Sequence, residues 1–266
     1  MYGTLLRVQW SFVMLDNHLL ERVSETLLLD IRRRLKPLDF VQGDCLAEPD
    51  TPIDMVIFPR SGLISIVVPL DDGDQIEAGW VGCRGALGGS VTLGAEQHFH
   101  RAVVRLAGRA WSMRPADARE IASTSAEFRK LMVVQEQHLL AQARQLAGCN
   151  AIHRIVQRLC FWLLRAQAET GGSELHLTQD NLAKMLGVQR ASLSMYASQL
   201  QEDGLISYRR GRVRISDVHE LTKRSCTCHQ ALELQYQRLF AGSTRPRNIP
   251  PAGAPDDHPT DGPAAH

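Results

Sequence analysis

Residues 177–216 constrain the fold of this chain more than any other stretch. Thr178 can begin a helix, because a threonine hydroxyl accepts hydrogen bonds from amides of the first helical turn. Gly187 can end that helix, since glycine readily adopts the left-handed backbone of a helix C-terminus. Between them the apolar residues have helical spacing: Leu182, Met185 and Leu186. A second helix is predicted over residues 190–202, with an inward stripe of Leu193, Ala197 and Leu200.

A basic hairpin follows the second helix. Gly204 ends the helix, and strand-forming residues at 205–206 and 213–215 flank a cationic tip made of Arg209, Arg210, Gly211 and Arg212. Two helices around a tight turn with a basic hairpin are typical of a winged helix-turn-helix. That unit places its second helix in the DNA major groove and its hairpin on phosphates. A plain helical hairpin with solvated charges is the alternative, but the order of these signals favours DNA binding.

The stretch LTQDNLAKMLGVQRASLSMYASQLQEDGLISYRRGRVRI resembles the DNA-binding domain of Crp/Fnr-type bacterial transcription regulators. A looser resemblance extends over about residues 16–240. It implies an α+β fold with a β-roll sensor like a cyclic-nucleotide-binding domain, a long dimerisation helix and a winged helix-turn-helix. It also implies a homodimer on a two-fold operator of double-stranded DNA. We further expect a cytoplasmic location and RNA polymerase as a partner.

We expect five parts in the chain. They are an N-terminal extension over residues 1–15, the β-roll over 16–124, the dimerisation helix over 125–148, the DNA-binding domain over 149–240 and a disordered tail over 241–266. The tail holds six of the twelve prolines. Residues 38–120 carry seven Arg and Lys against twelve Asp and Glu, a balance of −5, whereas residues 148–224 carry eleven against seven, a balance of +4. This asymmetry suits a sensor joined to a phosphate-binding module.

The resemblance assigns DNA contacts to the second helix and the hairpin. Arg190 is expected to make a bidentate contact with guanine. Met195 stands where members of the family often place a second arginine, so we do not expect the usual operator sequence. The full candidate set is Thr178, Gln189, Arg190, Ser192, Ser194 and Met195, with backbone contacts from Arg209, Arg210 and Arg212.

Residues 38–114 read as short strands separated by turns, which predicts a small antiparallel roll. Where cyclic-nucleotide-binding relatives carry a Gly-Glu pair and an Arg-Ser pair, this chain has Gly88-Gly89 and His100-Arg101. The ribose acceptor is therefore missing and the phosphate donor altered, so cyclic AMP is not expected. Arg84 and Arg101 could still meet another anion, although surface arginines on strand edges are the simpler interpretation. A small-molecule effector of another kind stays open, and no cofactor is required.

The six cysteines are scattered, which suits a reducing compartment, and no group near the N-terminus could hold an iron–sulfur cluster. Cys83 and His98 are possible haem ligands, but lone residues of these types are usually packing or surface residues. Cys226, Cys228 and His229, with His219 nearby, resemble a zinc or copper site. Because one intervening residue is tight for two ligands, we favour plain thiols and assign no metal; a redox- or metal-responsive regulator remains an alternative.

Residues 126–147 contain no helix breaker and carry a heptad seam. The seam predicts a parallel helix pair about a two-fold axis and consists of Phe128, Met132, Gln135, Leu139, Gln142 and Leu146. The alternative is that this stripe packs on the β-roll of the same chain. Asn150 is expected to mark a hinge, and residues 153–169 a further helix behind the DNA-binding one. That hinge would let the DNA-binding domain reorient as a rigid body.

Other functions find less support in the sequence. No apolar run is long enough to span a bilayer, and residues 1–15 lack a clear cleavage site for a secretory signal. Met14 is a possible alternative start. The chain contains no nucleophile elbow, phosphate loop, HExxH or paired-carboxylate motif, so we do not expect an enzyme. A sensor that acts mainly through a protein partner is the remaining alternative.

Overall fold

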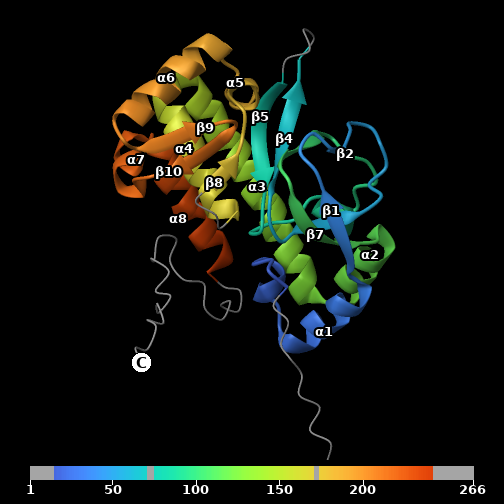
Figure 1. Cartoon of the computed structure of the whole chain (residues 1–266). Coiled ribbons are helices and arrows are strands. Elements are labelled where there is room, and N and C mark those ends of the chain that lie inside the picture. Colours follow the sequence, from blue (N-terminus) through green and yellow to red (C-terminus); the bar gives the residue numbers. More distant parts are fainter. Residues whose placement is uncertain (1–14, 71–74, 171–173, 242–266) are drawn as a thin grey trace, which may run out of the picture.

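The computed structural model describes residues 15–70, 75–170 and 174–241. Within them a β-rich lobe and a helical lobe lie side by side, and a long helix joins them (Figure 1). The expected N-terminal extension over residues 1–15 and the expected tail over 241–266 lie almost wholly outside the described residues. No helix in the described ranges combines the length and hydrophobicity that a membrane span requires.

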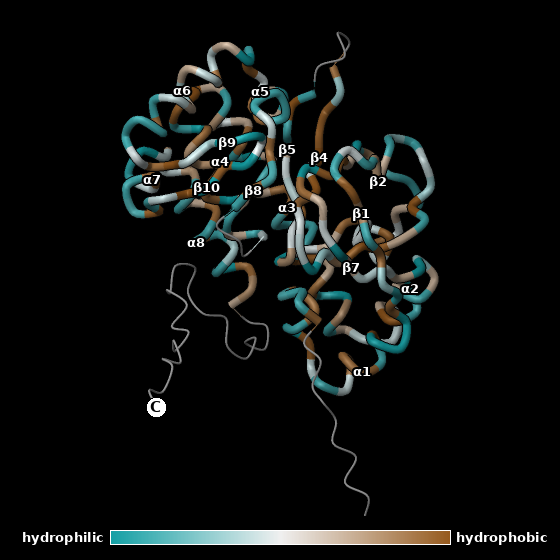
Figure 2. Tube along the Cα trace, viewed as in Figure 1, coloured by the Kyte–Doolittle hydropathy of each residue, from teal (hydrophilic) through white to brown (hydrophobic). Residues whose placement is uncertain are grey.

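The β-rich lobe is a sandwich of two antiparallel sheets, as the turn-punctuated sequence predicts. One sheet has the order β1-β7-β3 and the other β2-β6-β4-β5. The strands are β1 (Lys36–Phe40), β2 (Cys45–Ala47), β3 (Val56–Pro59), β4 (Leu63–Pro69), β5 (Gln75–Val81), β6 (Arg101–Leu106) and β7 (Gly108–Met113). The first five residues of β4 are all buried, and this strand is among the most hydrophobic segments of the chain (Figure 2). A continuous apolar run of this kind indicates a strand covered on both faces.

Short helices complete the β-rich lobe. They are η1 (Leu20–Arg22), α1 (Glu25–Arg34), η2 (Gly89–Leu93) and α2 (Pro115–Thr124). Of these, α1 and α2 lie together at one end of the lobe (Figure 1). η1 ends at Val23, whose backbone is extended with φ −92° and ψ 162°, and α1 begins two residues later.

The long helix α3 (Ala126–Ile152) begins at Ser125, whose hydroxyl accepts a hydrogen bond from the Phe128 amide at 3.2 Å. It continues through Asn150, the expected hinge, because Cys149 is buried there and keeps the last turns packed. The break instead falls at His153, where the backbone is extended, and α4 (Ile155–Thr170) follows.

The helical lobe contains α5 (Gln179–Leu186), α6 (Arg190–Glu202), α7 (Val218–Arg224) and α8 (Cys228–Phe240), with a sheet of order β8-β10-β9. Its strands are β8 (Glu174–His176), β9 (Ile206–Arg209) and β10 (Arg212–Ile215). Its core extends into the other lobe, since Leu63, Trp80 and Leu106 of the roll belong to the same buried cluster as Trp162 and Leu163 of α4. This buried apolar cluster, one of three among the described residues, therefore spans both lobes.

Candidate nucleic-acid interface

The first helix of the helix-turn-helix has the capping that its sequence predicts. The Thr178 hydroxyl accepts from the Asn181 amide at 3.2 Å. Gly187 ends α5 in the left-handed region, with φ 61° and ψ 45°. A residue with a Cβ would be strained there, so the glycine is required by the turn itself.

The second helix, α6, presents its N-terminal end to solvent. Its predicted inward stripe is buried: Leu193, Ala197 and Leu200. Gln189 and Arg190 are exposed, Ser192 is half-buried, and the Met195 side chain is 58% exposed. Figure 1 places α6 at the edge of the helical lobe, away from the β-roll. The geometry thus leaves the start of α6 free to enter a groove.

Two of the predicted DNA-contacting residues are already engaged within the domain. The Ser194 hydroxyl donates to the Gln179 side-chain oxygen at 2.6 Å, which ties α6 to the start of α5. The Thr178 hydroxyl serves as the α5 cap. Both side chains therefore hold the two helices in place.

The basic hairpin closes through a two-residue turn at Arg210 and Gly211, whose φ angles are 48° and 75°. Positive φ at both central residues is the conformation that matches the twist of a tight hairpin. Arg209, Arg210 and Arg212 are exposed, and Arg212 forms an ion pair with Glu174 at 3.3 Å. The Tyr208 hydroxyl donates to the Leu177 carbonyl at 2.7 Å and fixes the hairpin beside α5.

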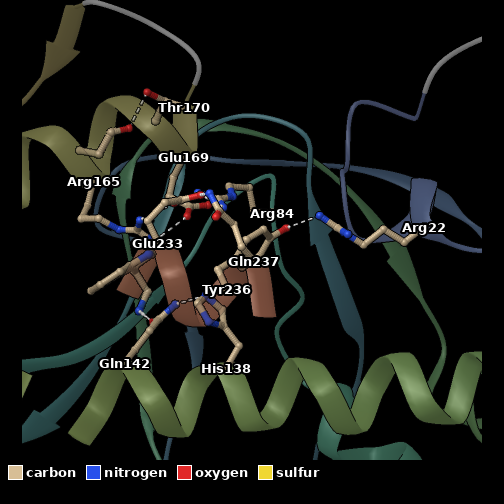
Figure 3. Close-up of polar contacts among 12 residues, drawn as sticks. Arg22, Arg84, His138, Gln142, Arg165, Glu169, Thr170, Glu233, Tyr236 and Gln237 are labelled. Atoms are coloured by element: carbon tan, nitrogen blue, oxygen red, sulfur yellow. Dashed lines mark hydrogen bonds and ion pairs between the residues drawn. The ribbon is translucent and has the colours of Figure 1, made fainter. Parts of the chain in front are cut away.

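The candidate ligand residues of the sensor do not form one site. Arg84 forms a bidentate ion pair with Glu233 of α8, at 2.9 and 3.1 Å, and stacks on Tyr236 (Figure 3). Gly88 leaves no room for a side chain, because a Cβ there would lie 2.7 Å from the Met55 carbonyl, whereas a Cβ on Gly89 would lie 3.1 Å from the flexible end of Glu136 on α3.

His100 and Arg101 have separate environments. Burial lowers the pKa of His100 to about 4, so this imidazole is neutral and a weak partner for a phosphate. Arg101 pairs with Glu48 at 2.7 Å and lines an open groove of about 380 Å³ between the roll and α5. The other charged side chains along this groove are Arg105 and Lys184.

Buried charges between the lobes were not expected from the sequence. Arg165 of α4, whose side chain is 2% exposed, pairs with Glu169 and with Glu233, each at 3.4 Å. Figure 3 shows Glu233 between Arg165 and Arg84. Burial opposes ionisation of Glu233, but the Arg84 and Arg165 guanidiniums hold its pKa at about 2.

A second polar contact between the lobes lies at Glu77 of β5. The indole of Trp162 on α4 donates to its carboxyl at 3.0 Å, and the Ser65 hydroxyl donates to its other oxygen. Burial nevertheless raises the pKa of Glu77 to about 7. The alternating sequence of β5 gave no sign that this carboxyl would point inward.

The predicted dimer seam faces the β-roll of its own chain. Gln135 donates to the Ala86 carbonyl at 3.2 Å, and Gln142 accepts from the Trp80 amide at 2.9 Å. Phe128, Met132 and Leu146 are buried, while Leu139 is half-buried against the roll core. This arrangement matches the alternative interpretation of the stripe.

The metal-like cysteines acquire partners that the sequence analysis missed. Cys226 and Cys228 gather with Cys149 and His153, in place of His219 and His229. No short-range pattern could have found this set, because its halves are more than 70 residues apart.

The possible haem ligands lie at different places on the roll. The Cys83 amide donates to the Glu169 carbonyl of α4, at 3.4 Å. The amide of His98 donates to the Thr51 carbonyl, and its ring contacts that of His100.

Comparison with known proteins agrees with this geometry. Residues 157–224 match the family model of the Crp-like helix-turn-helix domain. No curated protein sequence matches the chain. Among solved structures, FixK2 from Bradyrhizobium japonicum has a TM-score of 0.63 and 13% identity, covering 72% of this chain and 98% of its own.

Two further solved structures are similar. CLP, the c-di-GMP responsive global regulator of Xanthomonas campestris, has a TM-score of 0.59 and 16% identity, covering 73% of this chain and 100% of its own. A transcriptional regulator of the CRP/FNR family from Thermus thermophilus has a TM-score of 0.56 and 20% identity, covering 71% of this chain and 98% of its own. At these identities the similarity shows a shared fold.

Proposed function

We propose that this Crp/Fnr-type protein, with its Crp-like helix-turn-helix domain, is a sequence-specific transcription regulator that binds a two-fold operator as a homodimer. One observation carries the proposal. The start of α6 is exposed beside an exposed arginine hairpin, while the opposite face of α6 is anchored in the core. This is the arrangement that groove binding requires.

Base recognition is assigned to the first turns of α6. Arg190 can donate two hydrogen bonds to guanine, and Gln189 can pair with adenine. Met195 offers only apolar contact, which suits a thymine methyl. Ser192 is assigned to a phosphate or a base edge, whereas Ser194 and Thr178 act mainly by positioning the two helices.

Backbone contacts are assigned to the hairpin, through Arg209, Arg210 and Arg212. Guanidiniums near phosphates release counterions and so make binding salt-dependent, without reading sequence. In this proposal α6 recognises bases, and the hairpin adds affinity that does not depend on sequence.

The homodimer is proposed to use the solvent-facing row of α3, because the opposite row is filled by the roll of the same chain. This row has heptad spacing and consists of the half-buried Val133 and the exposed Gln137, Leu140, Arg144 and Ala147. Leu140 is 48% exposed, which is unusual for a leucine at the centre of a long helix. Leu140→Glu should convert a dimer to a monomer in light scattering, whereas Ser123→Glu on α2 should not; an unchanged mass for Leu140→Glu contradicts this face.

For ligand control we propose the groove beside Arg101, since it touches both lobes and offers cationic side chains to a small anion. A thermal-shift screen of anionic metabolites on the wild type and Arg105→Met tests it. Stabilisation of the wild type alone supports the groove, and equal stabilisation of both proteins contradicts it.

Selection of bound duplexes from random DNA, with and without cell extract, tests the main proposal. Enrichment of a two-fold symmetric site supports it. Failure to enrich any sequence under both conditions would favour a sensor that acts through a protein partner.

A further inference from the structure

Three sulfurs and one imidazole nitrogen converge where the long helix meets the DNA-binding domain. Cys149 lies in the last turns of α3, and His153 directly follows that helix. Cys226 lies between α7 and α8, and Cys228 begins α8. The four potential ligand atoms all lie within 4.8 Å of one another.

The separations match those of a tetrahedral zinc site. Zn–S bonds of about 2.3 Å and Zn–N bonds of about 2.0 Å place sulfurs about 3.8 Å apart and sulfur about 3.5 Å from nitrogen. Here Cys149 Sγ lies 3.6 Å from Cys226 Sγ, and Cys228 Sγ lies 3.5 Å from His153 Nδ1. A disulfide needs sulfurs about 2.05 Å apart, and all six cysteines are free.

The surroundings favour metal-bound thiolates. The Gln145 side-chain amide donates to Cys228 Sγ at 3.0 Å, as outer hydrogen bonds to zinc ligands commonly do. Arg158 lines the same small cavity as Cys149, and its charge would balance the net −1 of Zn²⁺ with three thiolates. Cys149, Cys226 and Cys228 are all buried, so the site is closed, as structural zinc sites are.

We propose that Cys149, His153, Cys226 and Cys228 bind one Zn²⁺ ion, and that this ion fastens the α7–α8 corner of the DNA-binding domain to the end of α3. Thiolate-rich tetrahedral sets select zinc over magnesium, calcium and manganese. The ion would bind on both sides of the break in helical structure at His153, between the long helix and the DNA-binding domain. Occupancy of the zinc site therefore sets how rigidly the two are joined. The inference is independent of the operator and of any effector.

Metal analysis of the full-length protein tests the proposal. We expect about one zinc per chain. After removal of zinc under reducing conditions, Co²⁺ should bind with the intense visible bands of a tetrahedral thiolate complex, and one equivalent of Zn²⁺ should abolish them. The proposal is overturned if bound Co²⁺ lacks these bands. It is also overturned if the purified protein holds only trace zinc and mass spectrometry finds a Cys149–Cys226 disulfide.

Variants locate the ion. Cys226→Ser and Cys228→Ser should lose it, whereas Cys45→Ser, which changes an exposed cysteine outside the cluster, should keep it. Gln145→Ala should retain the fold and weaken Zn²⁺ binding by about 10- to 100-fold in a chelator competition. The assignment is contradicted if Cys226→Ser contains as much zinc as the wild type. It is also contradicted if Gln145→Ala binds Zn²⁺ with unchanged affinity and Cys228→Ser retains zinc.

Discussion

The exposed face formed by α6 and the hairpin differs sharply from the buried layer between the two lobes. On the exposed face the arginines are solvent-exposed, Arg212 pairs with Glu174, which is also exposed, and the scaffold beneath them is apolar. In the buried layer Arg84, Arg165, Glu169 and Glu233 pair with one another across elements from both lobes. The first arrangement leaves charge available to a ligand, whereas the second uses charge to specify how the lobes dock.

The largest effect is expected from removing one charge of the buried layer. Arg165→Met should lower the free energy of unfolding by about 3–5 kcal/mol, because it removes the ion pair of the buried Glu169 carboxylate. The double variant Arg165→Met/Glu169→Met should regain much of this loss, since the Arg84–Glu233 pair remains. Denaturant titration measures both, and a double variant no more stable than the single one contradicts a role for pairing.

The Glu77 contact predicts a pH effect at the same interface. Its pKa in the folded state, about 7, lies above the ordinary value of 4.5. The folded protein therefore holds this proton more tightly than the unfolded chain, and the associated stability is lost as pH rises through 7. Between pH 5 and 8 the free energy of unfolding of the wild type should fall by about 1–3 kcal/mol relative to that of Glu77→Gln.

The control for Glu77 is Glu202→Gln, at an exposed site on α6. Its stability change measures what replacing any exposed glutamate by glutamine does. If the Glu77→Gln difference does not change across this pH range, the Glu77 carboxyl is not protonated inside the fold.

A smaller effect should follow from removing the α5 cap. Thr178→Ala should cost about 1 kcal/mol of stability, because the Asn181 amide loses its acceptor. Thr178→Ser keeps the hydroxyl and should be nearly neutral. Thermal unfolding of the two variants distinguishes loss of the cap from loss of side-chain volume. A large loss of stability in Thr178→Ser would indicate that side-chain volume, not the cap, matters.

The hairpin should contribute the smallest change per residue, and without sequence dependence. Arg210→Ala should weaken binding to operator and scrambled DNA alike and reduce the slope of log K against log salt by about 0.9. Arg119→Ala, an exposed change on α2, should leave the slope unchanged. Loss on the operator alone would move Arg210 from phosphate contact to base recognition.

Local signals made the exposed face predictable. Capping and periodicity depend only on residues close in sequence. They therefore suffice to place Thr178, Gly187 and the buried stripe of residues 193, 197 and 200. The bounds of α6 agree with the predicted range of 190–202.

The buried layer was not predictable in this way. Arg84 and Glu233 lie 149 residues apart, so nothing in either neighbourhood indicates the pair. Gln135 and Gln142 follow a heptad and suggested a helix pair, yet they bond to the Ala86 carbonyl and the Trp80 amide of the same chain. Periodicity shows which side of a helix is buried, but not what buries it.

Binding of the selected operator by Arg190→Ala tests the central claim most directly. The account predicts a loss of about 1–3 kcal/mol on the operator, relaxed preference at one base position and little change on scrambled DNA. Gln199→Ala, an exposed change near the far end of the same helix, serves as the matched control. Unchanged affinity and preference in Arg190→Ala, or an equal loss on both duplexes, would contradict base recognition by the start of α6.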